Sequence, residues 1–179
     1  MLRSRSIVVL MTILAAVVPR EAAAASALTP AQIHALLSSP ERHVRSDDGR
    51  ITKVLAEGLR RSTTFGDLMG ALNRTDVIVY IEGSAFLPST VTGRILLSVS
   101  KHGQRYARIQ IRLDRTTNEL IALIGHELRH AIEIGEAPEV VDDPSMVRLY
   151  ERIGHRADHR DHYDTAAARA TERQVRIEL

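Results

Sequence analysis

The segment 116–134 constrains the fold more than any other part of the chain, because its pattern predicts a helix that is apolar on nearly all sides. Thr116 and Glu119 have the spacing of a capping box, which predicts that the helix begins there. Its apolar residues are Leu120, Ile121, Leu123, Ile124, Leu128, Ile132 and Ile134. A helix of this composition is stable only when it is buried, so other elements must pack around it.

Two histidines and a glutamate interrupt this apolar helix as His126-Glu127-Leu128-Arg129-His130, an HExxH motif. Residues four apart share a helix face, so the two imidazoles can bind one Zn²⁺ ion. Glu127 lies beside that face, where it can take a proton from metal-bound water without being a ligand. Burial of unpaired polar groups is costly, which favours a functional role for the three side chains. The alternative is a pair of structural histidines that are hydrogen-bonded to backbone or carboxylate groups.

The other patterns predict an α+β fold, with a small sheet followed by a run of helices. Residues 77–81 are a continuous β-favouring run, which predicts a strand buried on both faces. Residues 94–113 alternate between apolar and polar side chains around a turn at 101–104, which predicts a hairpin. The predicted helices are 29–40, 47–59, 64–72, 116–134, 144–153 and 161–177.

Residues 1–27 have the organisation of a secretory signal peptide. Arg3 and Arg5 precede an apolar run from Ile7 to Val18, and an alanine-rich stretch follows. The run has about 12 residues, which is too short to cross a ~30 Å hydrocarbon core as a stable helix. We therefore expect an exported protein, periplasmic or secreted, in which residues 28–179 form a single domain without stable membrane insertion. An uncleaved N-terminal anchor is the alternative.

The composition narrows the classes of metal site and ligand that the chain can have. It contains no cysteine, which excludes disulfides, a thiolate nucleophile and a Cys-ligated zinc. Residues 1–27 contain three of the 24 Lys and Arg residues and one of the 22 Asp and Glu residues, so residues 28–179 are formally neutral. With 3% aromatic residues and no basic block, the chain is not expected to bind nucleic acid.

Residues 124–133, Ile-Gly-His-Glu-Leu-Arg-His-Ala-Ile-Glu, follow the predicted strand and hairpin and resemble the active-site helix of the zincin metallopeptidases. They are more closely similar to a group of small exported bacterial proteins. In that group a segment like 77–82 comes earlier in the chain, and an acidic-Thr-x-Ala segment like 164–167 comes later. The resemblance implies a small zincin-like sheet followed by an active-site helix and C-terminal helices. It also implies that an extended substrate lies along the sheet's edge strand, for which residues 94–113 are the candidates.

A catalytic zinc site has three protein ligands and an open position, and HExxH supplies only two of them. Residue 136 is a glutamate, so the third-histidine pattern HExxHxxGxxH is absent. In the resembling group a glutamate stands at the place of Asp164, which implies Asp164 as the third ligand after His126 and His130. Its alternative role is an N-cap or first-turn carboxylate of the last helix. Glu151 is the other candidate ligand, or else a solvated helix charge.

Other polar side chains near these positions have less specific roles. Glu133 lies too far along the helix axis from His126 to share its metal, so we expect it to be a partner of His130. The stretch that follows the fifth predicted helix contains a polar cluster of His155, Asp158, His159, Asp161 and His162. Three roles stay open for this cluster: a donor to an oxyanion, a separate metal site, or a solvated loop. Tyr163 either donates to a tetrahedral intermediate or packs its ring against the fold.

These expectations describe an exported zinc-dependent hydrolase of the metallopeptidase type, with a peptide or protein substrate. His126, His130 and Asp164 hold Zn²⁺, and Glu127 is the general base that activates water. Two alternatives stay open: a non-catalytic binding protein with a zincin fold, and a periplasmic metal-binding protein that uses the histidines near the C-terminus.

Overall fold

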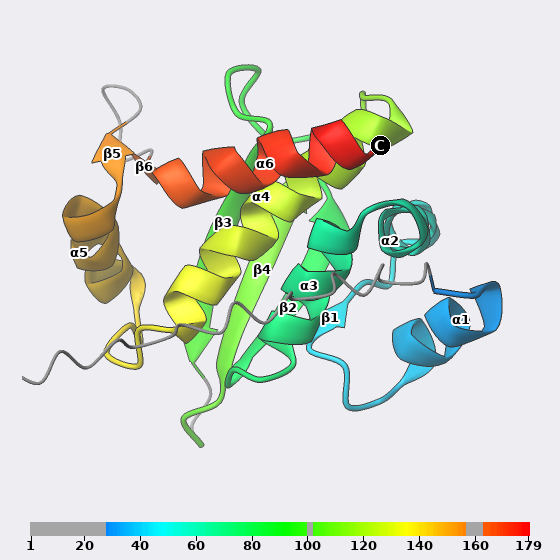
Figure 1. Ribbon diagram of the computed structural model, residues 1–179. Helices are drawn as coiled ribbons and strands as arrows, with labels where there is room; N and C mark the ends of the chain where they lie inside the picture. Colours follow the sequence, from blue (N-terminus) through cyan, green and yellow to red (C-terminus); the bar gives the residue numbers. More distant parts are fainter. Residues whose placement is uncertain (1–27, 100–101, 157–162) are drawn as a thin grey trace, which may run out of the picture.

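The computed structural model describes residues 28–99, 102–156 and 163–179, and it has the predicted α+β fold (Figure 1). The described residues form six helices, a four-stranded mixed sheet and a separate two-stranded ladder. The predicted signal peptide, residues 1–27, lies outside them. Within the described ranges, no helix has the length and hydrophobicity needed to cross a membrane.

The four-stranded sheet has the order β1-β2-β4-β3. β1 (Val44–Arg45) is parallel to β2 (Val77–Gly83), and β2 is parallel to β4 (Arg105–Ile111). β3 (Gly93–Val99) pairs antiparallel with β4, which confirms the predicted hairpin. β3 is therefore an edge strand, whereas β4 lies inside the sheet. β1 was not predicted, because two residues are too few for a strand period to appear.

One face of the sheet carries the hydrophobic core, and the described helices lie on that side (Figure 1). In β2, the side chains of Val77, Val79 and Ile81 are buried, whereas Tyr80 is 37% exposed. The prediction that this strand is buried on both faces is therefore wrong. A run of β-favouring residues indicates a strand, but it does not reveal which alternate side chains meet the core.

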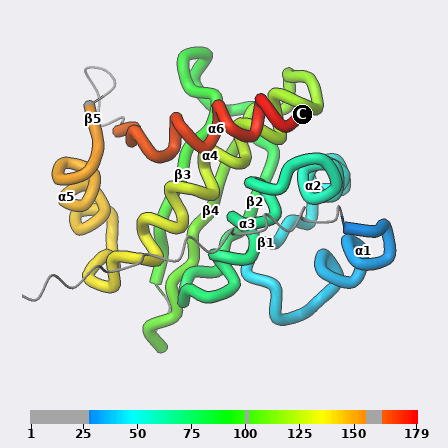
Figure 2. The backbone as a smooth tube through the Cα atoms, in the orientation of Figure 1, coloured from blue at the N-terminus to red at the C-terminus, as the bar shows by residue number. Residues whose placement is uncertain are grey.

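α4 (Thr117–Gly135) is the central helix of the fold, and it packs on the sheet as well as on α3 and α6 (Figures 1 and 2). The hydroxyl of Thr116 accepts from the backbone N–H of Glu119, and the Glu119 carboxylate accepts from the backbone N–H of Thr116. This is the predicted capping box. Buried residues occur on all sides of the helix between Leu120 and Ile134, which confirms the predicted central position.

The other helices surround α4 or extend the same layer. They are α1 (Pro30–Ser38), α2 (Gly49–Arg61), α3 (Thr63–Leu72), α5 (Asp143–Ile153) and α6 (Ala166–Glu178). The first four agree closely with the predicted helices.

The last helix begins later than the predicted residue 161. Tyr163–Asp164 form β6, which pairs antiparallel with β5 (His155–Arg156). Thr165 is the N-cap of α6, because its hydroxyl accepts from the backbone N–H of Ala168. Asp164 therefore precedes the cap, and its predicted alternative role as the N-cap or a first-turn carboxylate of this helix is wrong.

The far end of α6 is fixed to the junction between α2 and α3. Glu178 accepts hydrogen bonds from the hydroxyl of Ser62 at 2.5 Å and from the hydroxyl and backbone N–H of Thr64 at 2.6 and 3.0 Å. Burial alone raises the pKa of Glu178, but these hydrogen bonds lower that pKa to about 2. The carboxylate therefore stays ionised near neutral pH and holds α6 in place along α4.

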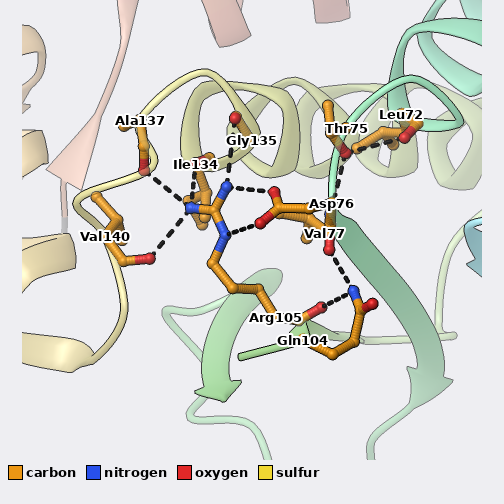
Figure 3. Close-up of polar contacts among 10 residues, drawn as sticks. All are labelled: Leu72, Thr75, Asp76, Val77, Gln104, Arg105, Ile134, Gly135, Ala137 and Val140. Carbon is orange, nitrogen blue, oxygen red and sulfur yellow. Dashed lines mark hydrogen bonds and ion pairs between the residues drawn. The ribbon is translucent and has the colours of Figure 1, made fainter. Parts of the chain in front are cut away.

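A buried arginine on β4 closes the C-terminal end of α4 (Figure 3). The Nη1 atom of Arg105 donates to the carbonyl oxygens of Ile134, Ala137 and Val140 at 2.9, 2.8 and 3.1 Å. Its Nε atom donates to Oδ2 of Asp76 at 3.0 Å, and Nη2 contacts the other oxygen of that carboxylate. The carbonyl groups of Ile134 and Ala137 also accept from the backbone N–H groups of Ala137 and Val140. The guanidinium therefore adds a charged donor to the carbonyl groups at the end of α4 and in the loop that follows.

Replacement of Arg105 by methionine should lower the free energy of unfolding by about 3 kcal/mol, because a group of carbonyl oxygens loses the charged donor that they share. The loss comes mainly from these carbonyls, since the Asp76 side chain is 57% exposed and can be solvated. Urea unfolding followed by circular dichroism measures the change. Arg108→Met is the matched control on the exposed face of the same strand, with an expected change within about 0.5 kcal/mol. Equal losses in the two variants would contradict this role for Arg105.

Candidate metal centre

His126 and His130 lie on one face of α4, and β6 brings Asp164 to the same place. The Nε2 atoms of the two histidines are 3.2 Å apart. Oδ1 of Asp164 is 3.5 Å from Nε2 of His126 and 3.9 Å from Nε2 of His130. One ligand atom from each residue lies within 4.8 Å of the other two, so this group could hold one metal ion. The structure thus brings together the three residues that the sequence suggested as ligands.

The ring of His130 is oriented by the carboxylate of Glu133. Nδ1 of His130 is 2.9 Å from Oε2 of Glu133, and both side chains are about 5% exposed. The other oxygen of Glu133 accepts a hydrogen bond from the Thr165 hydroxyl at 2.7 Å. Burial raises the pKa of Glu133, but His130 and Thr165 lower it overall. A carboxylate beside Nδ1 favours a proton on that atom, which leaves the lone pair on Nε2. The contact predicted between Glu133 and His130 is therefore present.

His126 has a corresponding carboxylate that the sequence did not suggest. Oε2 of Glu172, on α6, lies 3.3 Å from Nδ1 of His126. Burial lowers the pKa of His126, but Glu172, Glu127 and Asp164 together raise it. The contact with His126 is the main cause that lowers the pKa of Glu172 to about 2. Both imidazoles thus turn Nε2 toward Asp164.

The arrangement leaves three electron-pair donors facing one another. Oδ1 of Asp164 is buried and has no hydrogen-bond partner among the described residues. The carboxylates of Glu133 and Glu172 beside the two Nδ1 atoms favour protons there, which leaves each Nε2 atom free to bind a metal. Converging lone pairs repel each other unless a cation lies between them, and a buried carboxylate oxygen without a partner is costly. Two imidazole nitrogens and one carboxylate oxygen form a donor set that suits Zn²⁺. The residues present therefore fit a divalent metal.

Glu127 occupies the space beside the two histidines. Glu127 is only 6% exposed, and this burial raises the pKa of its carboxyl group. Gly93 on β3 makes room for it, because a Cβ atom there would lie 2.5 Å from Oε1 of Glu127. The requirement for glycine at this position follows from the approach of the edge strand to α4, which no local pattern reveals.

His126, Glu127 and His130 line a pocket with a volume of about 480 Å³. The edge strand and the loop before it form one wall, and α5 and β6 form the opposite wall. The residues that contribute to these walls include Thr90, Val91, Thr92, Gly93, Ile95, Met146, Val147, Tyr150, Tyr163 and Asp164. The candidate metal centre is therefore open to a ligand that lies beside β3.

Two tyrosines support the wall of the pocket formed by α5 and β6. The hydroxyl of Tyr150 donates to the backbone carbonyl of His130 at 3.2 Å, and its ring packs edge-on against the imidazole with centroids 5.3 Å apart. The ring of Tyr163 stacks on Tyr150, with centroids 6.4 Å apart. Tyr163 thus packs its ring, which was one of its two predicted roles, and it also lines the pocket.

The other described side chains that the sequence suggested as metal ligands are not part of this group. Glu151 is on the exposed side of α5, where it accepts a hydrogen bond from the Tyr163 hydroxyl at 3.4 Å, and it is not part of the metal-binding group. His155 is in β5, opposite Asp164. The other members of the predicted polar cluster, Asp158, His159, Asp161 and His162, lie outside the described residues.

The chain matches no family model, and no curated protein or solved structure is detectably similar to it. The resemblance to zincin metallopeptidases therefore stays a prediction, and a functional assignment must depend on the geometry and chemistry of the site itself.

Replacement of Glu172 by glutamine tests whether this carboxylate orients His126. We expect zinc affinity to fall by about 10–100-fold, as is typical when the partner of a ligating histidine is removed. Competition with a chromophoric chelator measures the affinity. Glu57→Gln removes an exposed carboxylate that pairs with Arg60 within α2, and it should leave zinc affinity unchanged. An unaltered affinity in Glu172→Gln would show that the contact with His126 has no role in metal binding.

Proposed function

We propose that this protein is a zinc-dependent hydrolase of the peptidase type. The observation that carries the proposal is the group of His126, His130 and Asp164, whose ligand atoms lie within 4.8 Å of one another beside the buried carboxylate of Glu127 in a pocket. A metal-binding group with an adjacent base is one arrangement that can hydrolyse an unreactive carbonyl compound.

His126, His130 and Asp164 would hold the metal, and Glu133 and Glu172 orient the imidazoles. A bound Zn²⁺ ion would supply Lewis acidity toward a carbonyl group and make water acidic near neutral pH. The fold provides two of these ligands on a rigid element, since both histidines lie on the buried helix α4.

Glu127 is the proton acceptor in this proposal. Burial raises the pKa of its carboxyl group, which brings its basicity closer to that of a base acting near neutral pH. Its carboxylate takes the proton from the attacking water and then delivers this proton to the amine that leaves. Gly93 keeps β3 close to this carboxylate, so a carbonyl group bound along the strand would lie next to the base.

The position of β3 supports a peptide as the substrate. β3 is an edge strand of the sheet, so its outer N–H and C=O groups have no strand partner among the described residues. Gly93 and Ile95 on this strand also line the pocket. An extended peptide could therefore add to the sheet and pass across the candidate metal centre. Export of the protein, proposed from residues 1–27, would place this activity outside the cytoplasm.

A metal-dependence experiment tests the proposal. The purified chain is incubated with a mixed library of synthetic peptides, with zinc present or removed by 1,10-phenanthroline, and new termini are identified by mass spectrometry. We expect cleavage that stops when zinc is removed and returns when zinc is restored. Stoichiometric zinc binding without cleavage of any peptide would favour the alternative of a non-catalytic metal-binding protein.

A further inference from the structure

The face of the sheet opposite the core carries a row of side chains that crosses all four strands. The strand register places Arg45 beside Tyr80, Tyr80 beside Arg108, and Arg108 beside Leu96. Residues opposite each other in neighbouring strands point to the same face of a sheet. Tyr106 and Arg94 lie on the same face in the neighbouring rows. We call this set of six residues the tyrosine–arginine face.

No carboxylate of the described residues lies within 4.0 Å of the three arginines of the tyrosine–arginine face, which are Arg45, Arg94 and Arg108. Arg45 donates to the carbonyl oxygens of Arg42 and Pro40 and to the Tyr80 hydroxyl. Arg94 donates to the side-chain oxygen of Gln110 at 2.7 Å. Elsewhere, ion pairs with Asp or Glu are made by Arg60, Arg105, Arg112, Arg115, Arg129, Arg152, Arg169 and Arg176.

Between these charges lie side chains that leave apolar surface exposed. Tyr80 is 37% exposed and Leu96 is 36% exposed. The rings of Tyr80 and Tyr106 have centroids 6.4 Å apart, and the guanidinium carbon of Arg45 lies 5.8 Å from the centroid of Tyr80. Tyrosine and arginine are, with tryptophan, the residue types enriched at the energetically important positions of protein interfaces. None of the described helices covers this side of the sheet (Figure 1).

We propose that the tyrosine–arginine face is a docking surface for an acidic segment of a partner protein. Glu82 lies on the same face, where its carboxylate accepts from the Gln110 side chain that also accepts from Arg94. The three guanidinium groups make no direct ion pair with it, so each would recognise a carboxylate of the partner, because their planar donor geometry matches that group. The tyrosine rings and Leu96 would bury the apolar side chains of the same segment. The surface does not depend on the metal, so it would serve to recruit or localise the protein rather than to hydrolyse a substrate.

A protein partner fits these observations better than a nucleic acid or a membrane does. Three arginines can neutralise only about three phosphates, and affinity for nucleic acids rises with the number of phosphates that are neutralised. Residues 28–179 are formally neutral, so no wider positive field adds to the patch. Binding to an anionic membrane is typical of lysine-rich clusters, whereas the charges of this face are arginines set among half-buried tyrosines.

Fluorescence anisotropy with a fluorescein-labelled ten-residue glutamate peptide tests the proposal in low-salt buffer. We expect saturable binding to the full chain, and at least fivefold weaker binding to the variant R45Q/R94Q/R108Q. The matched control is R74Q/R148Q/R173Q, which removes the same charge from exposed arginines on the helices or beside them, and its affinity should change less than twofold. Circular dichroism confirms that both variants are folded.

A second measurement uses the unmodified protein. In ¹H–¹⁵N spectra, the glutamate peptide should shift amide signals of β2 and β4 more than those of α6. Lack of binding, or equal weakening by the two triple variants, would overturn the proposal. A ten-residue oligothymidylate and phosphatidylglycerol vesicles are tested in the same way. If either binds more tightly than the glutamate peptide and this binding is lost in R45Q/R94Q/R108Q, the proposal is overturned and the face is assigned to that class of partner.

Discussion

Replacement of Glu127 by glutamine should reduce kcat/KM for peptide hydrolysis by roughly 10²–10⁴-fold, the usual contribution of a positioned acid–base group. Glutamine has nearly the same shape as glutamate, but it cannot accept the proton of the attacking water. Glu127 is not among the residues whose atoms converge at the candidate metal centre, so the variant should keep one zinc ion per chain. Steady-state kinetics on a cleaved peptide and metal analysis of the same sample measure the two quantities.

Glu139→Gln is the control for this prediction. Glu139 lies in the exposed connection between α4 and α5, where it pairs with Arg152. Its replacement should alter kcat/KM less than twofold. If Glu127→Gln retained full activity, Glu127 would not be the base, and if it lost zinc, the carboxylate would be needed for metal binding.

Replacement of His130 by alanine should weaken zinc binding by more than about 100-fold, which exceeds the effect expected for a residue that only orients a ligand. The substitution removes a ligand atom and the contact between His130 and Oε2 of the buried Glu133. Asp164→Ala should also weaken zinc binding strongly, since it removes the third donor. Competitive titration against a chromophoric chelator measures both affinities.

Glu151→Gln is the control that separates the two candidate third ligands. The side chain of Glu151 is exposed on α5, so its replacement should have no effect on zinc affinity. A loss of zinc in Glu151→Gln together with normal affinity in Asp164→Ala would reverse the assignment of the third ligand. Such a result would leave the roles of His126 and His130 intact.

The parts of the fold that depend on local pattern could be predicted from the sequence. The capping box at Thr116 and the apolar residues that follow it define α4, and the four-residue spacing of His126 and His130 places both rings on one face. The alternation along β3 and β4 indicated the hairpin, because each strand keeps a regular period of two.

The features that were missed depend on contacts between distant segments. Glu172 reaches His126 only because α6 packs along α4, although its position between the buried Ala168 and Val175 was an available signal. A carboxylate on the buried side of an amphipathic helix requires a partner, and that requirement could have pointed to the site. The start of α6 was placed too early, because a strand pair formed by Asp164 and His155 has no local signature.

X-ray absorption at the zinc edge tests the central claim most directly, because it reports the atoms that bind the metal. For the zinc-loaded chain, we predict two imidazole nitrogens and one carboxylate oxygen at about 2.0–2.2 Å, with the histidine signal reduced in His126→Ala. The account would be contradicted by a chain that takes up no zinc, or by a zinc site whose histidine signal is the same with and without His126.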